Sequence, residues 1–290
     1  MLPAAADSVG PSTGSVGGTT TDSVIVPVRP LQFRELLDLP FALLQARIKP
    51  LARVAAVAVA GASAIAIAAT VLISVATRDS DDGVLVGAII ATLLCAWVVR
   101  LIMRGVTVPM GLAVVHRRPL DRGGAFARLS EVAGPVLGYQ VMFTLIGIGV
   151  LALGTPLMIT LPLAVLWLAW LRARRSLTLP VIFDDSAPYK AATARSRLLT
   201  GGTEWQLVGV WLYLRALMVV LLVPLFALWN YVSDISGTRR WTVTVLIITI
   251  SLLMIAFAEM VESAAQVVAY VDRRCRREAW DIRVPGQARP

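Results

Sequence analysis

Residues 136–171 read VLGYQVMFTLIGIGVLALGTPLMITLPLAVLWLAWL, a run that contains no charged side chain. As one straight helix this run would be about 54 Å long, whereas the hydrocarbon core of a bilayer is only about 30 Å thick. The chain must therefore fold back within the run. Gly154-Thr155-Pro156 is the natural turn, since glycine and proline interrupt helices. The run predicts two membrane-spanning helices joined near Pro156.

Outside this run, the chain has further apolar stretches of similar character. Overall, 57% of the 290 residues are hydrophobic and 16% are charged, against about 25% charged in soluble proteins. The mean hydropathy of +0.76 agrees with a membrane protein. Two shorter apolar stretches surround Pro109 and Pro180; the first either continues its helix or lies at the interface. Four further runs are long enough to cross, which makes six spans: 51–77, 84–99, 205–229 and 241–258.

Three weaker stretches with helical periodicity precede the pairs of apolar runs, at residues 31–47, 119–134 and 186–199. In the first, Phe33, Leu36 and Leu44 share one face and charged residues take the other. Such segments are typical of helices that lie in the headgroup plane. We therefore predict an all-α, polytopic membrane helix bundle of six transmembrane helices, arranged as three hairpins that each follow an amphipathic interfacial helix.

The basic residues predict the orientation of this bundle. Only Arg78, Arg239 and Arg240 fall in the connections on one side, while the other side carries nearly all remaining cations. By the positive-inside rule both termini are cytoplasmic, in the inner (plasma) membrane. We expect a disordered cytoplasmic tail at 1–28, a six-helix transmembrane domain at 29–272 and a basic cytoplasmic tail at 273–290. The net charge of +9 then indicates contact with anionic lipid headgroups and no nucleic acid.

A few ionisable residues lie inside the predicted spans, where a charge costs about 2.5–3.5 kcal/mol. Arg215 lies in the fifth run, and Glu259 and Glu262 lie toward the cytoplasmic end of the sixth. Neighbouring helices could bring Arg215 and Glu259 together as an intramembrane polar pair. The pair would form a polar pocket or relay, or a purely structural ion pair; alternatively, Arg215 extends its charge to the inner interface.

No other residue pattern predicts catalysis. His116 is the only histidine and is expected at the surface, and Asp184-Asp185 reads as a solvated acidic turn rather than a weak cation site. The sequence offers no clustered metal ligands, no cofactor motif and no serine–histidine–aspartate set. Gly147, Gly149 and Gly154 predict close helix packing, because no phosphate-binding motif accompanies them.

Three stretches together resemble a known bacterial family. They are RPLQFRELLD at 29–38, AATARSRLLTGGTEWQL at 191–207 and YVDRRCRRE at 270–278. The chain is similar to actinobacterial-type integral membrane proteins related to the membrane domain of glycerophosphoryl diester phosphodiesterases. It departs from the pattern at Arg273, where leucine is common, and at Ala279, where glycine is common. The resemblance implies the six-helix architecture and an envelope location, but no catalytic residue, because the family's catalytic barrel and its two histidines are missing.

These observations leave three functional hypotheses. The first is a non-enzymatic accessory or scaffold subunit of a membrane complex, with other membrane proteins as partners. The second is a transporter or lipid-handling protein that uses a polar site around Arg215 and Glu259. The third, an enzyme that acts on a lipid phosphate, rests only on the family label. We expect no enzymatic activity.

Overall fold

The computed structural model describes residues 27, 29–78, 80–118, 120–154, 160–236 and 240–279. Over these residues the regular structure is helical throughout, which confirms the predicted all-α class. The helices follow the apolar runs and the amphipathic stretches of the sequence. Their bounds are α1 Phe33–Ala46, α2 Ile48–Ala76, α3 Asp81–Val115, α4 Arg122–Glu131, α5 Ala133–Gly154, α6 Leu161–Ala173, α7 Thr178–Asp185, α8 Tyr189–Thr200, α9 Glu204–Ser236 and α10 Arg240–Glu278.

Five helices in the described ranges are long and apolar enough to cross a membrane: α2, α3, α5, α9 and α10. They correspond to five of the six predicted spans. The remaining apolar run yields only α6, whose 13 residues extend about 20 Å along the helix axis. Because a hydrocarbon core is about 30 Å thick, α6 alone is too short to cross it. Residues 155–159, which include most of the predicted turn, lie outside the described residues.

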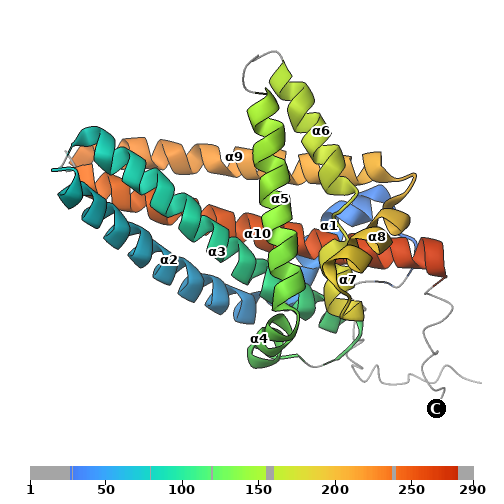
Figure 1. The fold of residues 1–290 in the computed structure, drawn as a ribbon. Coiled ribbons are helices and arrows are strands. Elements are labelled where there is room, and N and C mark those ends of the chain that lie inside the picture. Colours follow the sequence, from blue (N-terminus) through green and yellow to red (C-terminus); the bar gives the residue numbers. More distant parts are fainter. Residues whose placement is uncertain are drawn as a thin grey trace, which may run out of the picture.

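Helix α10 is the centre of the bundle. It packs against α1, α2, α3, α7, α8 and α9, and α2 also packs along much of α3 (Figure 1). The second half of α10 is buried nearly all round, and it is rich in alanine and valine. Small side chains allow neighbouring helix backbones to approach closely, which fits a helix that contacts so many others.

Helices α5 and α6 form a pair that does not run along the other long helices (Figure 1). In Figure 1 the two helices stand at a steep angle to α9 and α10, and α6 contacts α9 along part of its length. A Cβ atom on Gly154, the last residue of α5, would lie 2.6 Å from the Cβ of Ala164 in α6. Gly154 thus permits the close packing predicted for it. Gly147 and Gly149 have no such neighbour within 4 Å, so the same prediction was wrong for them.

The short helices gather at the end of the bundle where α3 and α10 end (Figure 1). With 35 and 39 residues, these two helices are about 52 and 58 Å long and exceed the thickness of a hydrocarbon core. Helix α3 continues past Pro109, which settles the two alternatives left open for that stretch. The helix α7 around Pro180 is buried from Thr178 to Phe183 and packs against α3, α5, α8 and α10.

The first and last described segments of the chain meet on α10. The backbone N–H of Leu31 donates to Asp272 Oδ1 at 2.8 Å, and Leu36 and Leu43 of α1 are buried. Helix α1 therefore packs on protein along one face, where the sequence predicts contact with headgroups. Helix α10 continues to Glu278, so the first residues of the predicted tail 273–290 are helical. The predicted tail 1–28 lies outside the described residues apart from Pro27.

Candidate functional site

Two helical stripes of opposite charge face each other between α3 and α10. Arg100 and Arg104 are four residues apart on α3, and Glu259 and Glu262 are three residues apart on α10. Both spacings place the two side chains on one face of a helix. Since α3 packs along α10, the arginines of one helix meet the glutamates of the other inside the bundle.

Glu259 is the most enclosed carboxylate of this network. Its two oxygens lie 2.6 Å from Arg100 Nε and 2.7 Å from Arg104 Nε. Arg104 Nη1 also donates to the side-chain oxygen of Gln140 on α5 at 2.8 Å. The side chains of Glu259 and Arg104 are 0% and 1% exposed, so each charge depends on the other for compensation.

Glu262, one turn further along α10, accepts a hydrogen bond from Arg215 of α9. A second guanidinium nitrogen of Arg104 lies 3.7 Å from the same carboxylate. The structure thus brings both predicted residues, Arg215 and Glu259, into one network but pairs each with a different partner. Among the described ion pairs, Arg215 is joined to Glu262, while Glu259 is held by Arg100 and Arg104.

Aromatic rings separate the arginines of the network. The guanidinium of Arg104 lies 5.4 Å from the ring centre of Phe143, and that of Arg172 lies 4.2 Å from the same ring. Trp211 lies between Arg172 at 5.4 Å and Arg215 at 5.5 Å. Ring faces attract cations, which lowers the cost of placing several guanidinium groups close together.

Counting charges shows that this network is not neutral. Four arginines, Arg100, Arg104, Arg172 and Arg215, face the two glutamates, which leaves two positive charges in excess. Arg172 is the cation without a carboxylate partner within the described part of the chain, and its Nε is buried without a hydrogen bond. An uncompensated charge at low dielectric is costly, and a bound anion would offset that cost.

A cavity of about 40 Å³ lies beside Arg172, where α5 and α6 meet α9 and α10. Tyr139, Trp211 and Gln266 also line it, together with Glu262. The Tyr139 hydroxyl, the Trp211 ring nitrogen and the Gln266 side-chain oxygen are buried and have no hydrogen-bond partner in the described part of the chain. A cavity of this size exceeds the roughly 10–15 Å³ that one water needs. The network therefore ends at a small, mostly apolar cavity, and several of the residues around it carry a polar atom without a partner among the described residues.

Sequence reasoning missed most of this site. Arg100, Arg104 and Arg172 were interpreted only as the charged ends of spans, and Tyr139 and Gln140 were not singled out. The spacing of four between Arg100 and Arg104, followed by apolar residues, is the pattern that could have indicated a buried cationic stripe. The placement of aromatic rings between the arginines depends on how each helix is rotated about its axis. The sequence contains no comparable pattern that indicates this rotation.

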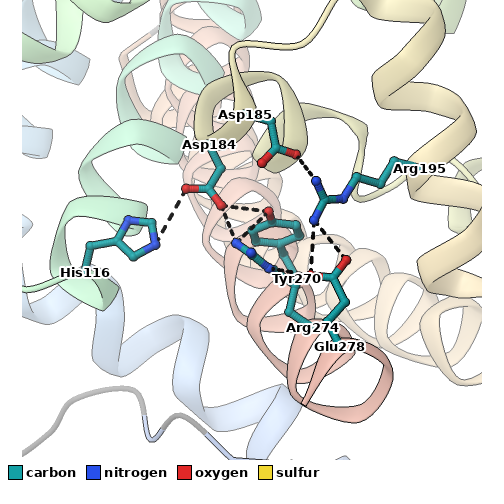
Figure 2. Close-up of polar contacts among 7 residues, drawn as sticks. All are labelled: His116, Asp184, Asp185, Arg195, Tyr270, Arg274 and Glu278. Atoms are coloured by element: carbon teal, nitrogen blue, oxygen red, sulfur yellow. Dashed lines mark hydrogen bonds and ion pairs between the residues drawn. The ribbon is translucent and has the colours of Figure 1, made fainter. Parts of the chain in front are cut away.

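A second polar cluster joins the ends of α3, α7 and α10 (Figure 2). Asp184 Oδ2 accepts from the Tyr270 hydroxyl at 2.8 Å and from Arg274 Nη1 at 2.6 Å. Its other oxygen lies 3.6 Å from Nε2 of His116. Burial lowers the pKa of His116 below its usual value of 6.5, and the neighbouring Asp184 carboxylate opposes this shift. The cluster acts as a polar clamp between three helices.

Asp185 extends the clamp to α8. Arg195 lies 2.6 Å from Asp185 and donates to Glu278 at 2.9 Å (Figure 2). Burial raises the pKa of Asp185, although Arg195 acts in the opposite direction. The prediction of a solvated acidic turn holds for Asp185, which is exposed, but not for Asp184, and His116 is only partly exposed because it faces Asp184. In the described ranges no cluster of three or more histidine, cysteine or acidic side chains could hold a metal ion.

Comparison with protein-family models, with curated proteins and with solved structures found no match to this chain. The architecture and the two polar clusters therefore define the protein as a multi-pass, all-α protein with membrane-compatible helices. The resemblance to the phosphodiesterase membrane domain stays a prediction.

Proposed function

We propose that this chain is a non-enzymatic integral membrane protein that handles an anionic lipid or solute through its buried arginine network. The observation that carries the proposal is the excess of two positive charges next to a cavity with unsatisfied wall groups. Ionisable groups at membrane depth are costly and commonly mark the paths of substrates or ions. A bound anion would balance the excess charge, which an apolar ligand could not do.

Transfer across reconstituted vesicles tests this proposal. The full chain is placed in neutral vesicles, and the movement of a labelled anionic lipid between leaflets is followed over time. We expect Arg215→Gln to slow the movement severalfold, because the excess charge falls and Glu262 loses its partner. Arg53→Gln on the exposed face of α2 is the matched control and should move lipid like the wild type. Equal rates in all three proteins would contradict the proposal.

The proposed topology keeps six membrane passes, three hairpins and both termini in the cytoplasm of the inner membrane. The polar clamp supports one shared side of the membrane for the ends of α3, α7 and α10, because His116, Asp184 and Arg274 lie in contact there (Figure 2). Helices α5 and α6 must then leave this end and return to it. The basic residues that follow α3, α6 and α10 also favour the cytoplasmic side for this end. Contact with anionic headgroups follows from the same charges.

A second candidate function is that of an accessory or scaffold subunit that binds other membrane proteins. The inclined α5–α6 pair favours it, since Leu145, Ile148 and Leu153 of α5 and Leu163 of α6 are well exposed. A photo-crosslinking residue at Leu163 should capture one discrete partner in native membranes, whereas the same residue at Leu72 on α2 should not. Crosslinking to lipid alone at both positions would count against this function.

A further inference from the structure

The cavity beside Arg172 has the chemistry of a binding site for one phosphate group. We propose that it binds the phosphodiester of an anionic phospholipid whose head also carries a hydroxyl group, an inference that rests on the proposed function. It names the ligand class and the residues that contact it. The cavity lies between the α5–α6 pair and the α9–α10 pair, and each of these four helices contributes to its wall.

Three buried donors belong to residues that line the cavity, each on a different helix. They are the Tyr139 hydroxyl on α5, the Arg172 Nε on α6 and the Trp211 ring nitrogen on α9. All three atoms are buried without a hydrogen-bond partner among the described residues, and Tyr139 is only 1% exposed. Buried polar groups are nearly always paired, so three unpaired donors around one space indicate a missing acceptor. A tetrahedral phosphate presents oxygens in several directions, whereas the two oxygens of a carboxylate lie in one plane.

The electrostatics favour a ligand with a single negative charge. Within the described ranges Arg172 forms no ion pair with a carboxylate, and its guanidinium lies between the rings of Phe143 and Trp211. An aromatic clamp fixes the direction of the planar donor group, as phosphate recognition by arginine requires. Glu262 lines the same cavity and would repel a second negative charge. A phosphodiester therefore fits better than a doubly charged phosphate monoester.

The remaining wall groups point to a lipid with a hydroxylated head. The buried Gln266 side-chain oxygen has no donor, so it can accept from a hydroxyl next to the phosphate. The other walls are apolar and include Leu207, Val210 and Leu214 of α9. Arg172 is one residue from the end of α6, and Trp211 lies about 10 Å along α9 from Glu204. This depth suits a headgroup at the edge of the hydrocarbon core.

Native mass spectrometry tests this phospholipid site. The full chain is placed in lipid nanodiscs of zero net charge, phosphatidylglycerol or phosphatidylcholine is added, and the lipid that stays bound after release is identified. We expect the wild type to retain phosphatidylglycerol in preference to phosphatidylcholine. Tyr139→Phe and Arg172→Gln should each weaken retention of phosphatidylglycerol about tenfold, the usual effect of losing one hydrogen bond to a charged group. Tyr139→Phe should also unfold no more easily than the wild type without lipid, because the lost hydroxyl has no protein partner. A purely structural role for the hydroxyl would instead lower stability.

The controls make the same chemical changes outside the cavity. Tyr213→Phe removes an exposed hydroxyl from α9, and Arg174→Gln removes a guanidinium that lies on Trp170; both should bind like the wild type. If Tyr139→Phe and Arg172→Gln retain phosphatidylglycerol as strongly as the wild type, the proposed site is wrong, but the proposed function is not contradicted. A wild-type protein that shows no preference for phosphatidylglycerol over phosphatidylcholine would overturn both the site and the proposed handling of anionic lipid. Displacement of the lipid by millimolar inorganic phosphate would overturn the assignment to a phospholipid.

Discussion

At the scale of single residues, Arg104 is the cation on which most of the buried network depends. It contacts Glu259, Glu262 and Gln140 from a position that is 1% exposed. Removing one member of a buried ion pair commonly costs about 3–5 kcal/mol, because the other charge stays behind. We expect Arg104→Met to lower the free energy of unfolding by about this amount, measured by denaturant titration in mixed micelles.

The matched control is Arg53→Met, which removes an exposed arginine from α2 and should change stability little. Adding Glu259→Leu to Arg104→Met should recover part of the loss, because the buried carboxylate that has lost one of its two arginine partners is then gone. Arg100, whose side chain is 28% exposed, can reach a polar environment on its own. A double variant that is less stable than Arg104→Met would contradict this account.

His116 makes the stability of the protein depend on pH. Burial lowers the pKa of His116 in the folded state, with Arg118 and Arg274 acting in the same direction and Asp184 against it. The unfolded chain therefore binds the proton more tightly, so stability is full above the usual pKa of 6.5 and falls as the pH drops through the folded value. We expect a loss of about 1 kcal/mol or less between about pH 7.5 and about pH 5.5.

Denaturant titrations at a series of pH values measure this loss. His116→Gln removes the only histidine of the chain and should flatten the profile over the same range. Asp185 acts in the opposite direction, because a carboxyl whose pKa is raised in the folded state makes stability rise as the pH falls. An unchanged slope in His116→Gln would show that another group is responsible.

The partners of single residues were the least predictable feature. The sequence placed Arg215, Glu259 and Glu262 at suitable depths, and the structure joins them in one network. Whether Arg215 meets Glu259 or Glu262 depends on a rotation and shift of α9 against α10 by less than one helical turn. Apolar periodicity does not fix such a shift, because many small residues on α10 allow several packings.

At the scale of elements, hydropathy predicted the long helices well. Runs of apolar residues correspond to α2, α3, α5, α9 and α10, and polar turns separate most of them. The short helices also appear near the predicted amphipathic stretches. Hydropathy did not indicate that α6 is as short as 13 residues, because its residues are as apolar as those of the longer helices. Nor could it show the protein-facing side of α1, which depends on distant residues of α10.

The α5–α6 pair allows a test with two similar glycines. A methyl group at Gly154 would lie 2.6 Å from the Cβ of Ala164, a contact that no side-chain rotation relieves. We expect Gly154→Ala to destabilise the pair by about 1–3 kcal/mol, the usual cost of overpacking. Gly147→Ala introduces the same methyl group where nothing lies within 4 Å, and it should be neutral or stabilising because alanine favours helix. Unfolding followed by denaturant titration compares the two variants, and equal effects would argue against close contact at Gly154.

At the scale of the whole molecule, the number of membrane passes is decided by α5 and α6. Their inclination to the other long helices leaves two arrangements: a hairpin that reaches the far side of the membrane, or one that turns back inside it (Figure 1). The proposed six passes require the first arrangement. The polar clamp fits both, because both return the chain to the end where α3 and α10 lie.

Cysteine labelling in intact cells separates the two arrangements. The background is Cys95→Ala with Cys275→Ala, so that neither native thiol, both of them buried, contributes to the labelling. With a membrane-impermeant maleimide, Arg78→Cys should be labelled from outside and Arg117→Cys only after permeabilisation. Six passes predict that Leu161→Cys, at a well-exposed position at the start of α6, reacts like Arg78→Cys. Protection of Leu161→Cys would show that the pair turns back within the bilayer.

The central position of α10 has a consequence for biogenesis. The helix that most others pack against is translated after the other nine described helices, and the hydrogen bond between Leu31 and Asp272 joins residues 241 positions apart. At the usual 5–20 residues per second, the ribosome needs roughly 10–50 s to make the chain between them. During that interval α1 and the cationic stripe of α3 await their acidic partners. Nascent chains that stall before α10 should therefore be prominent clients of membrane quality-control proteases.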